Sequence, residues 1–341
     1  MLKYIAKRLL RSLVTLAIVI TIIFSLLRLM PIEGYFPNYD KLSPGQIQAS
    51  LTSMGLLDPL PVQLWNFISG VFQGDLGTSL IYRVNVPITQ IIAEKAPISI
   101  ELGLLSVGLS LVVGIPLGVG MALASLVKQK KGVPSLAKKT ALGKCMDAVG
   151  MFFATIWEKL GTIFIVVIQA VPAAVYYLFI QLYGTDLFGI PTLFNKNNYA
   201  TWILPVVSLA LGNIAYYAMW LRRYMTDEIN KDYVQLARAK GVSSSGIMFR
   251  HVFRNAFVPM IQYLPGSILF TMMGSIYVES LYSIPGMGGL LVNVIQRQDN
   301  TMVQALVLIY SVISIVALIL GDILMSIADP RIKLGKKEEA R

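Results

Sequence analysis

The chain has 341 residues, of which 55% are hydrophobic and only 14% are Asp, Glu, Lys or Arg. A mean hydropathy of +0.67 excludes an ordinary soluble globular protein and indicates an integral membrane protein. The formal net charge is +11, but the basic residues stand in blocks between apolar segments, which favours a membrane protein over a nucleic-acid-binding one.

Six apolar segments are long enough to cross a bilayer, which takes about 20 helical residues. We place them at 9–30, 98–127, 161–184, 201–225, 257–280 and 303–327. The first follows basic residues, as the apolar region of a signal peptide does. No small-x-small cleavage site follows it, so we predict a retained membrane anchor.

The basic residues between these segments predict the orientation of the chain. Lys and Arg are frequent in the N-terminus, in 128–160, in 222–256 and in the C-terminal tail, and sparse in 31–97, 185–200 and 281–302. Basic connections stay on the cytoplasmic side. We therefore predict an all-α membrane protein with six transmembrane helices and with both termini in the cytoplasm.

This topology divides the chain into three parts. Residues 1–97 hold the first transmembrane helix and an extracytoplasmic loop, 98–330 form a five-helix core that contains the cytoplasmic loop 226–256, and 331–341 form a basic cytoplasmic tail. Within the long connection 128–160, Met146 to Ile156 is apolar but too short to span. It predicts either an interfacial helix or a cytoplasmic extension of the third span.

Small residues recur at every fourth position of the second span and form one stripe on a helix. They are Ser106, Ser110, Gly114, Gly118 and Ala122. Such a stripe allows close helix contact, either within this chain or with a second membrane subunit, and the sequence leaves both open. Prolines inside the predicted spans, at Pro116, Pro172, Pro205 and Pro265, predict helix kinks.

Ionisable residues are almost absent from the middles of the spans. Asp322, in the last span, is the best candidate for a functional intramembrane charge, and a helix-packing hydrogen bond is the alternative. Carriers driven by ion gradients bury carboxylates in the membrane. The sequence therefore indicates a chain without its own ion-coupling machinery.

Known catalytic, nucleotide and metal motifs are missing. The segment from Gly132 lacks the second glycine of a phosphate loop, where Ala137 stands, and has Lys139 where Ser or Thr should follow the lysine. His251, the only histidine, has no metal-ligand spacing, and we expect it to form a hydrogen bond. The single Cys145 excludes an intrachain disulfide. We expect the glycine-rich stretch 284–290 to form a tight turn or re-entrant backbone at the extracytoplasmic end.

The most distinctive segment is 232–256, a basic, helix-prone stretch between two apolar spans. Small residues lead to Gly241, which predicts a sharp turn, and Ser243 to Ser245 offer an N-cap for a second helix that runs through Phe249 and Phe253. Its apolar side chains suit a protein partner, whereas its charge also suits anionic lipid headgroups.

Two runs in this segment resemble the ATPase-coupling loop of ABC importer permeases, specifically of the dipeptide and oligopeptide branch. They are Asp232-Tyr-Val-Gln-Leu-Ala-Arg-Ala-Lys-Gly241 and Arg250-His-Val-Phe-Arg-Asn-Ala-Phe-Val-Pro259. Further resemblances extend along the chain at Gly55-Leu-Leu-Asp-Pro-Leu-Pro-Val-Gln63, Gly74-Asp-Leu-Gly-Thr-Ser79, Gly114-Ile-Pro-Leu-Gly118, Ser283-Ile-Pro-Gly-Met-Gly288 and Asp329-Pro-Arg331.

The resemblance implies the permease fold of a type I ABC importer and a set of partners. These are a homologous second permease, two cytoplasmic ATPases that bind ATP and Mg²⁺, and an extracytoplasmic solute-binding protein, in a bacterial or archaeal cytoplasmic membrane. The chain itself would bind no cofactor and catalyse no reaction. It would form the path for dipeptides or oligopeptides. Nickel chelates, glutathione and oligosaccharides are alternative cargoes within the family, and a secondary carrier working alone is the alternative from another class.

The resemblance also implies which residues dock on the ATPase. They are Ala237, Arg238, Ala239, Lys240, Gly241, Ser243, Ser244, Ser245, Phe249 and Arg250. Residues that line the substrate path do not follow from the motifs.

Overall fold

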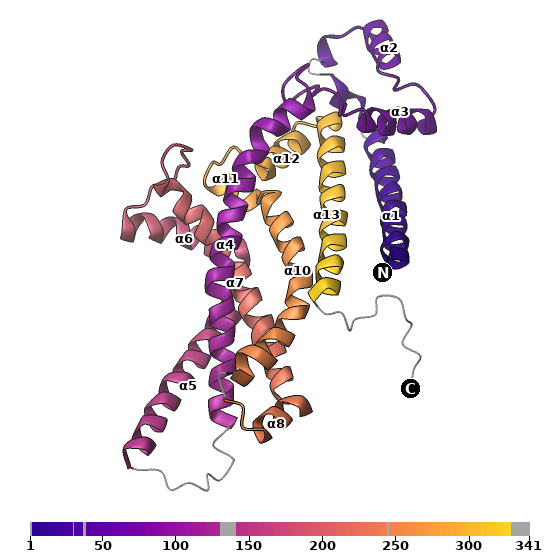
Figure 1. Ribbon diagram of the computed structural model, residues 1–341. Helices are drawn as coiled ribbons and strands as arrows, with labels where there is room; N and C mark the ends of the chain where they lie inside the picture. Colours follow the sequence, from indigo (N-terminus) through magenta and orange to yellow (C-terminus); the bar gives the residue numbers. More distant parts are fainter. Residues whose placement is uncertain (1, 30, 37–38, 130–140, 244–245, 329–341) are drawn as a thin grey trace. The chain divides into compact units, whose positions relative to one another are not determined.

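The computed structural model describes residues 2–29, 31–36, 39–129, 141–243 and 246–328, and these residues are almost entirely helical (Figure 1). Within them the only β pairing is an isolated bridge between Thr78 and Pro87. The predicted all-α class is therefore confirmed.

Six helical segments of the described chain are long and apolar enough to cross a membrane: Leu9–Arg28, Ile88–Ala124, Phe152–Ala170, Ala200–Ile229, Ile247–Leu281 and Asn300–Ala328. They belong to α1 (Leu2–Arg28), α4 (Ile88–Gln129), α5 (Ala141–Ala170), α7 (Ala200–Ile229), α10 (Arg254–Met272) with its neighbours, and α13 (Asn300–Ala328). The predicted number of spans is confirmed.

The third span lies elsewhere than predicted. A continuous helix over 161–184 was expected, with a kink at Pro172, but α5 ends at Ala170 and a separate helix, α6, runs over Ala173–Phe188. Pro172 sits between them with φ −53° and ψ 133°, outside the helical region. Proline lacks a backbone N–H and disfavours the helical conformation of the residue before it, so the helix stops.

The start of α5 distinguishes the two structures predicted for 146–156, an interfacial helix and an extension of the third span. Because α5 begins at Ala141, this apolar stretch is the first part of the same helix that contains the third candidate span. It is an extension of that helix and no separate interfacial helix.

The remaining elements are short. Between α1 and α4 lie two single-turn 3₁₀ helices (Ile32–Tyr35 and Tyr39–Lys41), α2 (Pro44–Ser53) and α3 (Leu60–Phe72). After α7 come α8 (Asp232–Ala239) and a π-helix (Ile247–Phe253), and after α10 come α11 (Ile276–Leu281) and α12 (Met287–Gln296).

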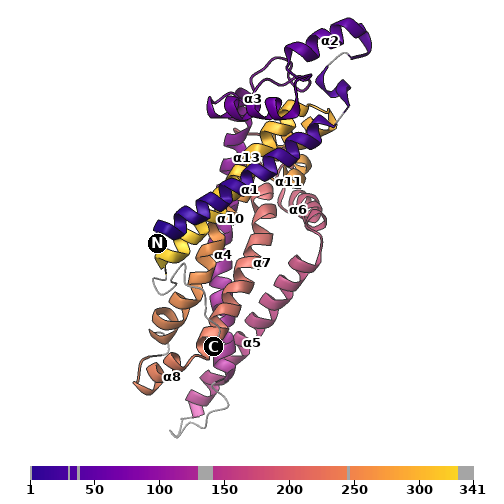
Figure 2. The ribbon, with the colours of Figure 1, turned by 90° about the vertical axis from the view of Figure 1, so that its right-hand side faces the viewer.

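The described chain forms two compact units. One contains residues up to Glu101 together with Met272–Ile319, and its core is built from α4, α12 and α13 around Ile88, Leu290 and Leu306. The other contains Leu102–Thr271 together with the described residues from Leu320 to Ala328. In its core α7 packs with α8, the π-helix and α10 around Tyr217 and Met248, and α5 lies alongside α7 (Figure 2).

The small-residue stripe of α4 packs inside this second unit. A Cβ added to Gly114 would lie 3.0 Å from the carbonyl oxygen of Ile214, and one added to Gly118 would lie 2.8 Å from that of Ala218. Ser110 donates a hydrogen bond to the carbonyl of Ala210 at 3.2 Å. Close contact with α7 of the same chain therefore explains the stripe.

Candidate functional site

The predicted turn in 232–256 has a well-defined geometry. Gly241 follows α8 with φ +77°, a left-handed conformation that glycine adopts without strain. Its N–H donates to the carbonyl of Arg238 at 3.0 Å, and the N–H of Val242 donates to the carbonyl of Ala237 at 3.1 Å. This pair of bonds is a Schellman motif, which caps the helix C-terminus, and it confirms the sharp turn at Gly241.

Ser243 begins the next helical segment. Its Oγ accepts a hydrogen bond from the N–H of Gly246 at 3.2 Å, and its carbonyl accepts from the N–H of Ile247 at 2.9 Å. The N-cap predicted for Ser243 to Ser245 is thus confirmed for Ser243. Ser244 and Ser245 lie outside the described residues.

One face of the segment is buried against the rest of its unit. It places Val234, Ala237, Met248 and Val252 in a single apolar cluster with Met225 and Ile229 of α7. Ala237, predicted to dock on the ATPase, therefore packs inside the chain. Burial of this face fixes the position of the turn relative to α7 and α10.

The other face of the segment exposes large apolar side chains. Leu236 and Phe249 are each 57% exposed, and Val242 is also exposed. The predicted residues Arg238, Ala239, Lys240, Gly241, Ser243 and Arg250 are exposed on the same segment. Exposed apolar side chains among cations are typical of a surface that binds another molecule.

Tyr233 links this segment to the neighbouring helices through hydrogen bonds. The Tyr233 hydroxyl donates to the carboxylate of Glu228 on α7 and lies 3.4 Å from the carbonyl of His251, while Asn255 donates to that hydroxyl at 2.9 Å. Tyr233 thus joins α7, α8 and α10. His251 takes part through its main-chain carbonyl. No local sequence pattern indicates these contacts, because the hydrogen bonds to Tyr233 come from residues up to 22 positions away.

Two further polar contacts hold helices of the same unit together. Arg222 of α7 forms an ion pair with Glu158 of α5 at 2.7 Å and donates to Thr162 at 3.0 Å. Asp322 accepts a hydrogen bond from Gln262 of α10 at 3.2 Å. For Asp322 this contact supports the helix-packing alternative over a functional intramembrane charge.

In the other unit, a buried carboxylate organises the glycine-rich stretch. Glu279 of α11 is buried, with Oε1 accepting from Ser99 Oγ at 2.7 Å and Oε2 accepting from the N–H of Gly289 at 2.9 Å. Ser99 Oγ in turn accepts from the N–H of Met287 at 2.8 Å. The carboxylate is thereby tied to the first turn of α12, where free N–H groups favour negative charge.

The glycines of 284–290 allow the backbone to approach Glu279 closely. A Cβ on Gly286 would lie 2.5 Å from Cδ of Glu279, and one on Gly288 would lie 2.8 Å from the backbone nitrogen of Ile276. The positive φ in this region belongs to Ser283, at 56°, and to none of these glycines. The chain does turn between α11 and α12, where the N–H of Gly286 donates to the carbonyl of Ile284 at 2.9 Å. The glycines add close approach to Glu279, and re-entrant backbone, the other predicted alternative, stays a prediction.

Metal ligands are not gathered in the part of the chain that the structure describes, where no group of three or more His, Cys, Asp or Glu side chains could hold an ion. Cys145 belongs to α5, but its side chain lies outside the description.

Comparison with known proteins gives the family. The family described as "Binding-protein-dependent transport system inner membrane component" matches residues 147–334, and its N-terminal counterpart matches residues 1–102. The dipeptide transport system permease protein DppB of Lactococcus lactis subsp. cremoris is 31% identical over 98% of this chain and 100% of its own length.

Two other relatives are 30% identical. The glutathione transport system permease protein GsiC of Pectobacterium atrosepticum matches 98% of this chain and 99% of its own, and the oligopeptide transport system permease protein OppB of Haemophilus influenzae matches 98% and 100%. A crystal structure of an amino acid ABC transporter with histidines covers 72% of this chain and 95% of its own, with 17% identity and a TM-score of 0.47. The two family models together match residues 1–102 and 147–334, which is most of the chain. The chain therefore belongs to the family of binding-protein-dependent transport system inner membrane components, the ABC importer permeases.

Proposed function

We propose that this chain is the transmembrane subunit of an ATP-driven importer of dipeptides or short oligopeptides. Two of the relatives named above are dipeptide and oligopeptide permeases that match almost the whole chain. The importer would contain a homologous second permease, two cytoplasmic ATPases and an extracytoplasmic solute-binding protein, in a bacterial or archaeal cytoplasmic membrane. ATP and Mg²⁺ would bind to the ATPases.

The distribution of basic residues supports the orientation of the chain. The connection that contains α8 carries Arg222, Arg223, Lys231, Arg238, Lys240, Arg250 and Arg254. Because basic connections are retained in the cytoplasm, segment 232–256 and both termini would face the ATPases.

The exposed face of 232–256 is the observation that carries the docking proposal. Leu236, Val242 and Phe249 expose apolar surface next to Arg238 and Lys240. An amphipathic helix that meets a partner binds through such apolar anchors, and the surrounding cations contribute mainly to orientation and association rate. Ala237 supports the surface from inside and makes no contact with the partner.

The buried face explains how docking would produce movement. The cluster around Val234 and Met248 and the hydrogen bonds of Tyr233 tie the segment to α7 and α10. A packed interior transmits displacement, since it is close to incompressible. Closure of the ATPase dimer would therefore move α7 and α10 together with the docked segment.

The double variant Leu236→Ala, Phe249→Ala tests the docking proposal. Truncation of buried interface anchors costs about 1–2 kcal/mol each, so the affinity for the ATPase should fall by at least about tenfold, and uptake should fall with it. Thermal stability should be unchanged, because neither side chain packs in the core. Phe72→Ala is the control, since Phe72 of α3 is also an exposed phenylalanine, at 88%, and lies outside segment 232–256.

Two results would contradict docking. Wild-type ATPase affinity in the double variant would remove the face from the interface. Loss of binding to anionic vesicles, with ATPase affinity retained, would show that the face lies on lipid headgroups.

Glutathione is a second candidate cargo, because the Pectobacterium relative is named a glutathione permease at 30% identity. Competition decides between the two: unlabelled glutathione would abolish uptake of a labelled dipeptide if it is the preferred cargo, and would leave uptake intact if peptides are.

A further inference from the structure

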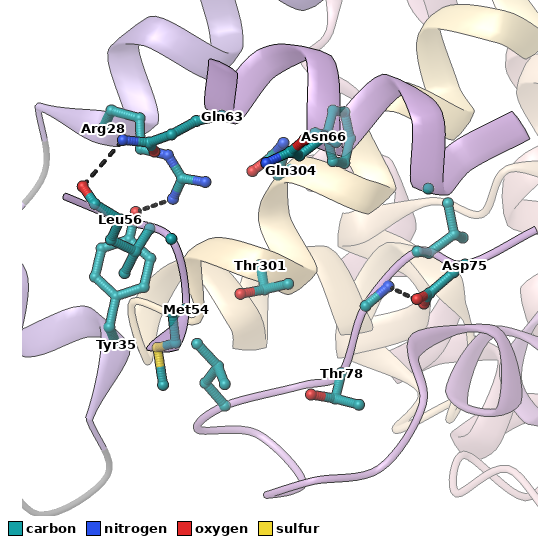
Figure 3. A pocket seen from close by; sticks show the side chains of 16 residues that line it. Arg28, Tyr35, Met54, Leu56, Gln63, Asn66, Asp75, Thr78, Thr301 and Gln304 are labelled. Atoms are coloured by element: carbon teal, nitrogen blue, oxygen red, sulfur yellow. Dashed lines mark hydrogen bonds between the residues drawn. The ribbon is translucent and has the colours of Figure 1, made fainter. Parts of the chain in front are cut away.

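A cavity of about 320 Å³ lies within the first compact unit, between the end of α1, α3, the chain around Asp75 and the start of α13 (Figure 3). Sites for small ligands typically begin at about 300 Å³. The cavity is thus large enough for a molecule of roughly the size of a dipeptide.

Buried polar atoms without partners line this cavity. Gln63 is 8% exposed, and its Nε2 donates to the carbonyls of Leu56 at 2.9 Å and Asp58 at 2.7 Å, while its Oε1 is buried and unpaired. Gln304 is 7% exposed, and its Nε2 is buried and unpaired. Each such atom costs about 1–3 kcal/mol when left unsatisfied, which a ligand with both a donor and an acceptor would recover.

Two opposite charges stand at the ends of the cavity. Arg28 is held over the rings of Phe24 and Tyr35 and donates to the Tyr35 hydroxyl at 2.7 Å, and its Nε is buried and unpaired. Asp75 accepts from the N–H of Gly77 at 2.8 Å through one oxygen. In Figure 3, Arg28 and Asp75 lie on opposite sides, with Gln304 between them in the view.

The wall next to the exposed Asp75 is held in place by a buried carboxylate, that of Asp299. Asp299 accepts hydrogen bonds from Ser79 Oγ at 2.7 Å and from the N–H groups of Ile81 and Tyr82, both at 3.0 Å. These bonds fix the chain after Asp75 to the start of α13. The cavity is therefore formed before a ligand arrives, which lowers the entropic cost of binding.

We propose that this cavity binds a short zwitterionic peptide, with the peptide carboxylate at Arg28, the ammonium group at Asp75 and the amide between Gln63 and Gln304. The proposal rests on the proposed function, since it takes the cargo to be peptide, and it adds a binding site on the permease itself. A zwitterionic phospholipid headgroup presents the same two charges but no amide, so the two glutamines favour the peptide.

The test measures binding of labelled Ala-Ala to the full chain in lipid nanodiscs, without the solute-binding protein. Wild-type chain should bind Ala-Ala at least about tenfold more tightly than N-acetyl-Ala-Ala-amide, which lacks both charges. Glycerophosphoethanolamine, the free headgroup, should displace Ala-Ala only at about tenfold or higher excess over unlabelled Ala-Ala. Equal affinity for the capped peptide, or equal displacement by the headgroup, would overturn the proposal.

Gln304→Leu separates binding from folding. Replacing an unsatisfied buried amide by an apolar group of similar size should leave thermal stability equal or higher, while the Kd for Ala-Ala rises about tenfold. Gln73→Leu is the matched control, because Gln73 is exposed at the end of α3 and does not line the cavity. Wild-type affinity in Gln304→Leu, or an equal loss in Gln73→Leu, would refute the assignment.

Uptake by the assembled importer distinguishes a failure of the cavity assignment from a failure of the proposed function. If the importer takes up Ala-Ala but the chain binds none, the cavity assignment fails and the proposed function stands. If wild-type importer transports no peptide, the proposed function fails.

Discussion

Replacement of Gly241 probes the turn on which the proposed docking surface depends. A Cβ at this position would meet no other atom within 4 Å, so the added Cβ itself creates no clash. The cost of substitution comes only from the left-handed backbone angle of φ +77°. Gly241→Val thus changes the preference of the turn and leaves the packing of α8 untouched.

The magnitude follows from that backbone angle. Holding a residue with a side chain in the left-handed region costs roughly 1–2 kcal/mol, and a β-branched residue stands at the upper end. Opening the turn would release this strain. The fraction of molecules with the turn closed, which is the form that docks, would then fall by up to about 30-fold, and the apparent Kd for the ATPase would rise by the same factor.

The assay is the Kd of the purified ATPase for nanodisc-embedded Gly241 variants, with uptake measured in parallel. Asn tolerates the left-handed region better than other residues with side chains, so affinity should decrease in the order Gly, Asn, Ala, Val. Equal ATPase affinity of the Gly241→Val variant and the wild type, or equal losses in Gly241→Asn and Gly241→Val, would refute a role of the left-handed turn in docking.

Three further substitutions test the contacts that hold the helices. Gly118→Leu should lower thermal stability by several kcal/mol, since even a Cβ would lie 2.8 Å from the carbonyl of Ala218; an unchanged melting temperature would exclude close packing of α4 on α7. Glu279→Leu leaves two buried donors unpaired and should cost about 2–5 kcal/mol in a melting assay, whereas Glu279→Gln keeps a carbonyl acceptor and should cost less; equal losses would contradict this role. Arg222→Leu should destabilise the chain more than Arg222→Leu combined with Glu158→Leu, because the single change strands a largely buried carboxylate; additive losses in a double-mutant cycle would rule out the coupling.

Much of the architecture was predictable because it is encoded locally. Hydropathy over about 20 residues identifies a span without knowledge of its neighbours, and five of the six spans lie close to their predicted positions. The turn at Gly241 and the cap at Ser243 are equally local, since their hydrogen bonds join residues a few positions apart. The predicted position of the third span was wrong because the helix ends before Pro172. Whether a proline kinks a helix or ends it depends on what surrounds the helix.

Contacts between distant residues were decided only in three dimensions. Ser99 and Glu279 are 180 positions apart, and Ser79 and Asp299 are 220 apart, so no local pattern announces that they pair. The cavity around Gln63 and Gln304 likewise exists only because α3 and α13 meet.

Segment 232–256 combines features that are set locally with features that are set by packing. Its composition determined a helix, a glycine turn and a basic character, because each depends on neighbours in sequence. Which side chains face outward depended on α7: Ala237 turned inward and Leu236 outward because burial of one face against Met225 and Ile229 sets the rotation of α8. Sequence determined what kind of segment this is, and packing decided which of its atoms a partner can reach.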